Sequence, residues 1–166
     1  MVVSDDKDTI DWYRMMTLSG MYFSENNWDR KHIAAGYKMH TTSIQAYIAN
    51  ENLKKLDKKN ERLDEISMVY NAAFRYNNIS RHLYRVRVNN NSQFVEEMKQ
   101  CGIVCGIHYE HCHKKPFYGW KGDLPISEKE SLETVSLPFH ENLADKDINK
   151  VIRNVKRLAS LKTTGE

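Results

Sequence analysis

The chain has 166 residues, of which 40% are hydrophobic and 28% charged, and this suits one ordinary globular domain with a buried core. Its net charge of +3 suits an anionic small ligand, but there is no concentrated basic stripe of the kind that binds nucleic acid. No stretch has the apolar length of a membrane span, the start has no secretory pattern, and three cysteines crowded into residues 101–112 do not form a disulfide framework, so we expect a soluble, cytoplasmic protein with reduced thiols.

The first forty residues predict one helix and a connecting segment. Acidic residues at positions 5 to 8 precede apolar residues at helical spacing, and Gly20 would end that helix. Residues 24–37 show little periodicity and contain turn-forming Asn and Gly, so we expect a connecting loop there.

Residues 41–75 contain the strongest local pattern. Thr42 and Gln45 form a capping box, in which each side chain bonds the other residue's backbone N–H. The apolar residues that follow recur at helical spacing: Ala49, Leu53, Leu56, Leu63, Ile66, Tyr70 and Phe74. We therefore expect one long amphipathic helix whose charged face is solvated surface.

A strand, a helix and a second strand are predicted next. Residues 83–88 alternate between apolar and other side chains, as a half-exposed strand does. Arg85 and Arg87 occupy the outer face, where they could meet an anionic substrate, although an ordinary exposed strand face is favoured. A helix should end at Gly102, and residues 103–107 have the composition of a strand.

The last part of the chain begins with a long irregular segment, residues 109–126. A capping box at Ser127 and Glu130 follows, then a short strand near Val135 and a final helix from Asp145. Alternating strands and helices predict an α/β or α+β fold, with a small mixed or antiparallel sheet covered by helices.

Six residues of zinc-ligand type fall in one window: Cys101, Cys105, His108, His111, Cys112 and His113. Thiolate and imidazole are the preferred ligands of zinc, but zinc sites usually use two separated pairs, and adjacent residues seldom bind one ion. Small thiols near helix ends and in strands are also common in protein cores. We therefore expect no metal site and keep a zinc-binding domain as a distant alternative.

Four stretches in the order of the chain resemble the second half of DegT/StrS sugar aminotransferases, which use pyridoxal phosphate and have the type I aminotransferase fold. These are residues 1–6, residues 36–46 beginning Gly-Tyr-Lys-Met-His, residues 102–109 ending Gly-Ile-His-Tyr, and residues 124–140 ending Ser-Leu-Pro-Phe-His. Each stretch is a weak signal alone, and it is their shared order over nearly the whole chain that establishes the resemblance.

The resemblance implies three parts and a missing catalytic group. Residues 1–40 would be the end of the large domain with a connecting loop, residues 41–75 a linking helix, and residues 76–166 the small C-terminal domain. In this family the cofactor forms a Schiff base with a lysine just before a Gly-Glu-Gly-Gly element, and an acidic residue on an earlier strand holds the pyridine nitrogen protonated. Both would precede Met1, so we expect no catalytic residue in this chain and no activity without an N-terminal half.

Two residues of the second stretch would contact ligands according to this resemblance. Lys38 stands where the family commonly has an Asn that reaches the phosphate of the partner subunit's cofactor, and a lysine can bind phosphate as a charged donor. His40 stands at a common Arg, and as a substrate contact it would lack the fixed fork of a guanidinium.

The third stretch would form one wall of the substrate cleft. His108 and Tyr109 would line it, with His113 nearby. The alternative is a polar loop that packs against Phe117 and Trp120 and has no functional role.

The implied reaction moves an amino group from an amino acid, with glutamate the expected donor, to a nucleotide-linked keto-sugar. The complete enzyme would be a homodimer, in which this chain is joined by its N-terminal half or by a full-length subunit. A non-catalytic remnant or interaction module of a truncated gene is the alternative from another functional class. The sequence does not separate the two.

Overall fold

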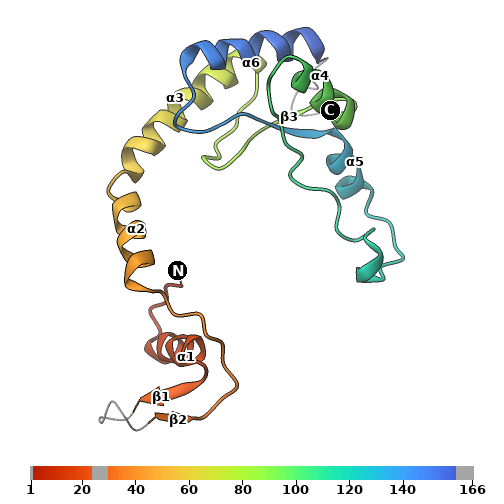
Figure 1. Ribbon diagram of the computed structural model, residues 1–166. Coiled ribbons are helices and arrows are strands. Elements are labelled where there is room, and N and C mark those ends of the chain that lie inside the picture. Colours follow the sequence, from red (N-terminus) through yellow and green to blue (C-terminus); the bar gives the residue numbers. More distant parts are fainter. Residues whose placement is uncertain (1, 24–29, 160–166) are drawn as a thin grey trace. The chain divides into compact units, whose positions relative to one another are not determined.

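A computed structural model of the chain describes residues 2–23 and 30–159. They form two compact units, one within positions 1–54 and one within positions 55–166 (Figure 1). No helix in these described ranges is long and apolar enough to cross a membrane. Helices and a small antiparallel sheet occur in each unit. The sequence pattern predicts helices and one small sheet, and it does not predict the sheet of the first unit.

The first unit contains helix α1 (Lys7–Thr17), strands β1 (Met21–Phe23) and β2 (Arg30–His32), and helix α2 (Ser43–Leu53). Asp6 begins α1, because its carboxylate accepts the backbone N–H of Asp8 at 3.1 Å. β1 and β2 form an antiparallel pair next to α1 (Figure 1). The connecting loop predicted for residues 24–37 therefore contains a strand, while residues 24–29 lie outside the described residues. All three residues of β2 are exposed, so no hydrophobic alternation marks the strand in the sequence.

The long helix predicted for residues 41–75 consists of two helices, α2 and α3 (Leu56–Phe74). The capping box at its start is confirmed: Gln45 donates its N–H to Thr42 Oγ1 at 3.3 Å, and Thr42 donates its N–H to Gln45 Oε1 at 2.9 Å. Lys54 and Lys55 form a turn between the helices, yet both keep right-handed helical dihedral angles. The interruption is a local loss of helical hydrogen bonding that the residue pattern does not signal.

The second unit continues with β3 (Tyr84–Arg87), α4 (Asn91–Gln100), the short 3-10 helix η1 (Pro116–Tyr118), α5 (Pro125–Glu133), β4 (Thr134–Leu137) and α6 (Asp145–Leu158). α3 and α6 lie side by side (Figure 1). β3 pairs with β4 in antiparallel register, with Arg85 opposite Ser136. The final helix begins at Asp145 as predicted.

Two predicted features of this unit are wrong. Residues 103–107 do not form a strand, because only Gly106 pairs with β4, through an isolated bridge to Ser136. The capping box at Ser127 also fails, since α5 begins two residues earlier at Pro125, whose fixed φ suits the first position of a helix.

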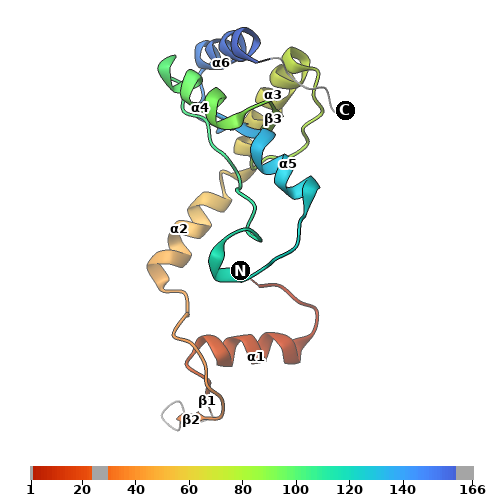
Figure 2. The same cartoon turned by 90° about the vertical axis from the view of Figure 1, so that its right-hand side faces the viewer.

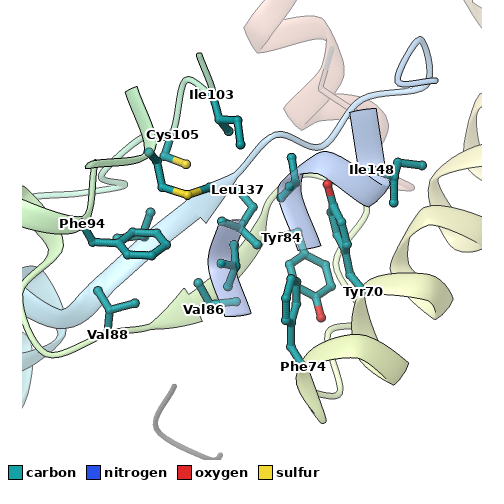
Figure 3. Packing of buried hydrophobic residues seen from close by; sticks show 14 of the residues in the cluster. Tyr70, Phe74, Tyr84, Val86, Val88, Phe94, Ile103, Cys105, Leu137 and Ile148 are labelled. Carbon is teal, nitrogen blue, oxygen red and sulfur yellow. The ribbon is translucent and has the colours of Figure 1, made fainter. Parts of the chain in front are cut away.

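The core of the second unit lies between one face of the β3–β4 pair and the helices α3, α4 and α6. Tyr70, Phe74 and Tyr84 pack against one another there (Figure 3), with the Tyr70 and Tyr84 ring centroids 4.9 Å apart. Tyr70 is fully buried, and its hydroxyl donates to the carbonyl oxygen of Pro138 at 3.1 Å. Burial of large aromatic side chains is the main stabilising contribution here.

Residues 107–124, which we call the arm, extend away from this core in both views (Figures 1 and 2). The aromatic side chains along the arm are largely exposed: Tyr109 73%, Phe117 79%, Tyr118 63% and Trp120 55%. The arm therefore contributes little apolar burial within its own unit.

Candidate functional site

Lys38 lies on a segment that is held against the end of α1. Ser19 donates its N–H to the carbonyl oxygen of Tyr37 at 2.9 Å, and Met39 donates its own to that of Thr17 at 2.9 Å. The Lys38 side chain is exposed and makes no ion pair with any residue that the structure describes. Its ammonium group is therefore available to an anion.

Two glycines make this close approach possible. A Cβ on Gly20, whose φ is +73°, would lie 1.9 Å from the carbonyl oxygen of Ala34. A Cβ on Gly36 would lie 2.1 Å from the backbone nitrogen of Gly20. Any larger residue at either position would push the Lys38 segment away from α1, which gives Gly36 in the predicted motif a physical role.

His40 lies beside a hollow of about 610 Å³ in the first unit. Side chains of α1, among them Ile10, Tyr13 and Arg14, line this hollow together with Met39 and His40. Lys38 is not among the lining residues, so the two predicted contacts of this segment do not share one hollow.

In the second unit, His108 is fixed against the outer face of the β3–β4 pair. Its Nδ1 lies 2.9 Å from Ser136 Oγ, and Gly106 exchanges two backbone hydrogen bonds with Ser136, at 2.7 and 3.0 Å. A Cβ on Gly106 would come within 2.5 Å of the His108 ring. The glycine therefore leaves the space in which the imidazole folds back onto Ser136.

His113 is held by a carboxylate of α5. Its Nε2 lies 2.9 Å from Glu128 Oε1, which also accepts the N–H of Leu124 at 3.0 Å and lies 3.3 Å from Lys114 Nζ. The hydrogen bond from His113, followed by those from Leu124 and Lys114, lowers the pKa of Glu128 to about 2. Glu128 is thus an ionised anchor that joins the arm to α5.

Three predicted substrate contacts, His108, Tyr109 and His113, come together around one hollow of about 510 Å³. Tyr109 presents its ring edge-on to His108, with centroids 5.0 Å apart. Phe117 and Trp120, against which the alternative reading packs this loop, are themselves mostly exposed.

Arg85 and His111 are among the other residues that line the same hollow. The sequence allows Arg85 to meet an anionic substrate but favours an ordinary exposed strand face, and it suggests His111 only as a zinc ligand. The alternation of β3 places Arg85 on the outer face, but its proximity to His108 depends on the pairing of β3, β4 and Gly106, which the sequence does not reveal.

The cysteine and histidine window does not assemble a metal site in the described part of the chain. No three His, Cys, Asp or Glu side chains there could hold one ion together, so the zinc alternative finds no ligand set in residues 2–23 and 30–159. The three cysteines are free thiols, and burial raises the pKa of Cys105 to about 11.

Comparison with known proteins shows the family to which this arrangement of two units belongs. Residues 1–156 match the family described as the DegT/DnrJ/EryC1/StrS aminotransferase family, and the chain belongs to that family. The resemblance seen in the sequence is thereby confirmed.

The most informative relatives are about twice as long as this chain. The protein MJ1066 of Methanocaldococcus jannaschii is 30% identical over 96% of the chain and 49% of its own length. The spore coat polysaccharide biosynthesis protein SpsC of Bacillus subtilis is 27% identical over 94% of the chain and 48% of its own length. The chain thus spans about half the length of the curated relatives it matches.

Solved structures agree on the fold. Helicobacter pylori PseC, an aminotransferase involved in the biosynthesis of pseudoaminic acid, superimposes with a TM-score of 0.85 at 18% identity, over 95% of this chain and 47% of PseC. The PLP-form of a sugar aminotransferase from Streptococcus pneumoniae gives a TM-score of 0.78 at 19% identity, over 93% and 44%. The predicted fold, that of the C-terminal part of a type I aminotransferase, is therefore confirmed.

Proposed function

We propose that this chain is the C-terminal half of a pyridoxal-phosphate-dependent enzyme that transfers an amino group from glutamate to a nucleotide-linked keto-sugar. The observation that supports this proposal is the family match over residues 1–156, on a chain that covers only about half of each relative. In this proposal the lysine that carries the cofactor belongs to the other half. The enzyme works in the cytoplasm, where three free thiols remain reduced.

Exposed apolar surface on α2 supports the need for a partner. No residue of α2 is buried, and Ile44, Tyr47 and Ile48 are 73%, 68% and 54% exposed. An exposed apolar surface of this kind is normally covered by a partner protein, and it promotes aggregation when it stays uncovered. In the proposed enzyme the N-terminal half, or a full-length subunit in a homodimer, covers it.

The chain's own residues would bind the cofactor and the substrate and hold them in position. The cofactor, when bound, supplies the electron sink for amino-group transfer. Lys38 fits the role of a phosphate ligand for the partner subunit's cofactor, since its ammonium is exposed and makes no ion pair within the described ranges. His40 would contact substrate in the first unit, while His108, Tyr109 and His113 would form a polar wall against the sugar.

Reconstitution with a matching N-terminal half tests this proposal. Co-expression should give a complex that transfers an amino group from glutamate to a keto-sugar nucleotide, whereas each half alone should be nearly inactive, because positioning accounts for a large part of the barrier reduction. Lys38→Gln should raise the cofactor concentration needed for activity, and Lys31→Gln, outside the proposed contact, serves as the control. If the halves neither associate nor react while the lone chain is a folded monomer, a non-catalytic remnant or interaction module is the better description.

Cofactor trapping gives an independent test. Borohydride reduction of the chain mixed with pyridoxal phosphate should fix no stoichiometric label, because the expected lysine lies in the other half. Mass spectrometry that places one reduced cofactor at Lys7 or Lys38 would contradict this division of roles.

A further inference from the structure

The outer face of the β3–β4 pair carries a row of polar side chains. Tyr84 and Val86 point into the core and are fully buried, so Arg85 between them faces outward. Arg85 lies directly opposite Ser136, whose hydroxyl contacts His108 at 2.9 Å. Directly opposed residues of an antiparallel pair project their side chains to the same face. Arg85, Ser136 and His108 therefore follow one another across this face.

Among the charged side chains that line the hollow, Arg85 is the one without an ion-pair partner in the described part of the chain. Arg87 makes an ion pair with Glu130 at 2.5 Å, and Glu110 pairs with Lys115. These two glutamates are the carboxylates that line the hollow, and each already has a basic partner. Arg85 is exposed and makes no ion pair among the residues that the structure describes. Arg85 therefore presents to the hollow a guanidinium that has no carboxylate partner among the described residues.

His111 is a second polar residue of the same hollow. The hydroxyl of Ser131, on α5, accepts the backbone N–H of His111 at 3.1 Å and so holds this residue against the helix. The ring nitrogen Nδ1 of His111 is buried and has no hydrogen-bond partner in the described part of the chain. A buried polar atom without a partner is costly, and a ligand that forms a hydrogen bond with this nitrogen would remove the cost. The hollow thus combines a guanidinium with an imidazole that lacks a partner.

We propose that Arg85 and His111 bind an oxyanion of the substrate in the hollow between the arm and the β3–β4 pair. This inference rests on the proposed function and adds to it a determinant of substrate charge. The oxyanion is either a phosphate of a nucleotide-linked sugar or a carboxylate. Arg85 can bind either group through two parallel N–H bonds, and the hollow of about 510 Å³ accepts a group of that size.

Anion titration of the 166-residue chain tests the site without any need for catalysis. Inorganic phosphate and acetate serve as separate probes at constant ionic strength, with amide NMR shifts as the measurement. Saturable shifts are expected at Arg85, His111 and Ser136. The probe that binds more tightly identifies the phosphate or the carboxylate as the source of the oxyanion.

Variants decide whether Arg85 is responsible. Arg85→Gln should weaken binding about five- to ten-fold, as expected for the loss of a partly exposed charged contact. Arg85→Lys should fall between Gln and wild type, because it keeps the charge but loses the fork. Arg153→Gln, an exposed arginine of α6 away from the hollow, is the matched control and should bind like wild type.

Equal binding by Arg85→Gln and wild type, or shifts that never saturate, would overturn the proposal. Thermal midpoints of all variants should agree, because the substituted residues are exposed. Failure here with successful reconstitution would reject only the anion site. Anion binding without reconstitution would instead reject the proposed transferase activity.

Discussion

The core and the arm of the second unit are stabilised in different ways. The core buries Tyr70, Tyr84 and Val86 completely between a strand pair and three helices. The arm leaves its aromatic side chains exposed and is joined to β4 and α5 by polar contacts at three residues, Ser136, Ser131 and Glu128. Apolar burial determines the fold, whereas a few hydrogen bonds determine where the histidines lie.

Truncation of Tyr70 should give the largest loss of stability. Tyr70→Ala removes a fully buried ring and should lower the free energy of unfolding by about 3 to 5 kcal/mol, measured by urea denaturation. Tyr70→Phe is the control, and it should cost about 1 kcal/mol because only the hydrogen bond to Pro138 is lost. A loss for Tyr70→Ala no larger than that of Phe would show that the aromatic cluster does not stabilise the unit.

The substitution Gly106→Ala should displace His108 at the base of the arm. The added Cβ would meet the ring at 2.5 Å, and because a side chain can move, the expected cost is one hydrogen bond, about 1 kcal/mol. Ser136→Ala should cost a similar amount by removing the same bond. The double variant should then be only slightly less stable than either single variant, and strictly additive losses in denaturation would argue against the shared hydrogen bond.

Protonation of Glu128 in acid should break the contact that joins the arm to α5. The loss in free energy of unfolding should be smaller than in the preceding predictions, because this carboxylate is partly exposed. Its folded pKa of about 2 lies below the ordinary value of 4.5, so the folded chain binds this proton less tightly than the unfolded chain. The contribution of ionised Glu128 to the free energy of unfolding is therefore present above pH 4.5 and is lost as the pH falls towards 2. Carboxyl NMR shifts would follow the titration, and Glu128→Gln should remove this contribution. Titration near the ordinary value would mean that the His113 contact does not persist.

Truncation of an arm aromatic should have the smallest effect on the chain alone. Phe117→Ala should change the free energy of unfolding by less than about 0.5 kcal/mol, because the ring is 79% exposed. In the presence of a matching N-terminal half the same change should weaken association about ten-fold, since buried aromatic residues dominate interfaces. Lys121→Ala on the same arm is the control for both measurements. A large loss of stability in the lone chain would show that the arm packs within its own unit.

Elements with a strong pattern of their own were predictable from the sequence. The apolar stripe of α6 and the capping box at Thr42 were both found, because each depends only on residues a few positions apart. The strand predicted at residues 103–107 failed because a pattern of apolar residues does not show how many of them find a pairing partner. Here only Gly106 does so.

The candidate site was predictable only in part, for a related reason. His108, Tyr109 and His113 are close in sequence and stand in a recognisable stretch, so they were found together. Arg85 lies on a strand more than twenty positions earlier. It lines the same hollow because β3 pairs with β4 at Arg85 and Ser136, and Ser136 in turn pairs with Gly106. Pairings between distant segments are not encoded in local spacing, and a single sequence does not reveal them.

The three free cysteines lie in different surroundings, so a thiol-reactive dye should label one of them before the others. Cys105 is buried, and its pKa of about 11 keeps it protonated at neutral pH, when a thiol reacts slowly with an alkylating dye. Cys101 is partly buried, and its sulfur accepts a hydrogen bond from Arg157 at 2.9 Å. Cys112 is exposed on the arm beside His111 and His113, so a maleimide fluorophore should attach there first. One dye molecule, without any engineered cysteine, would then report by its emission whether the arm becomes covered when a partner is added.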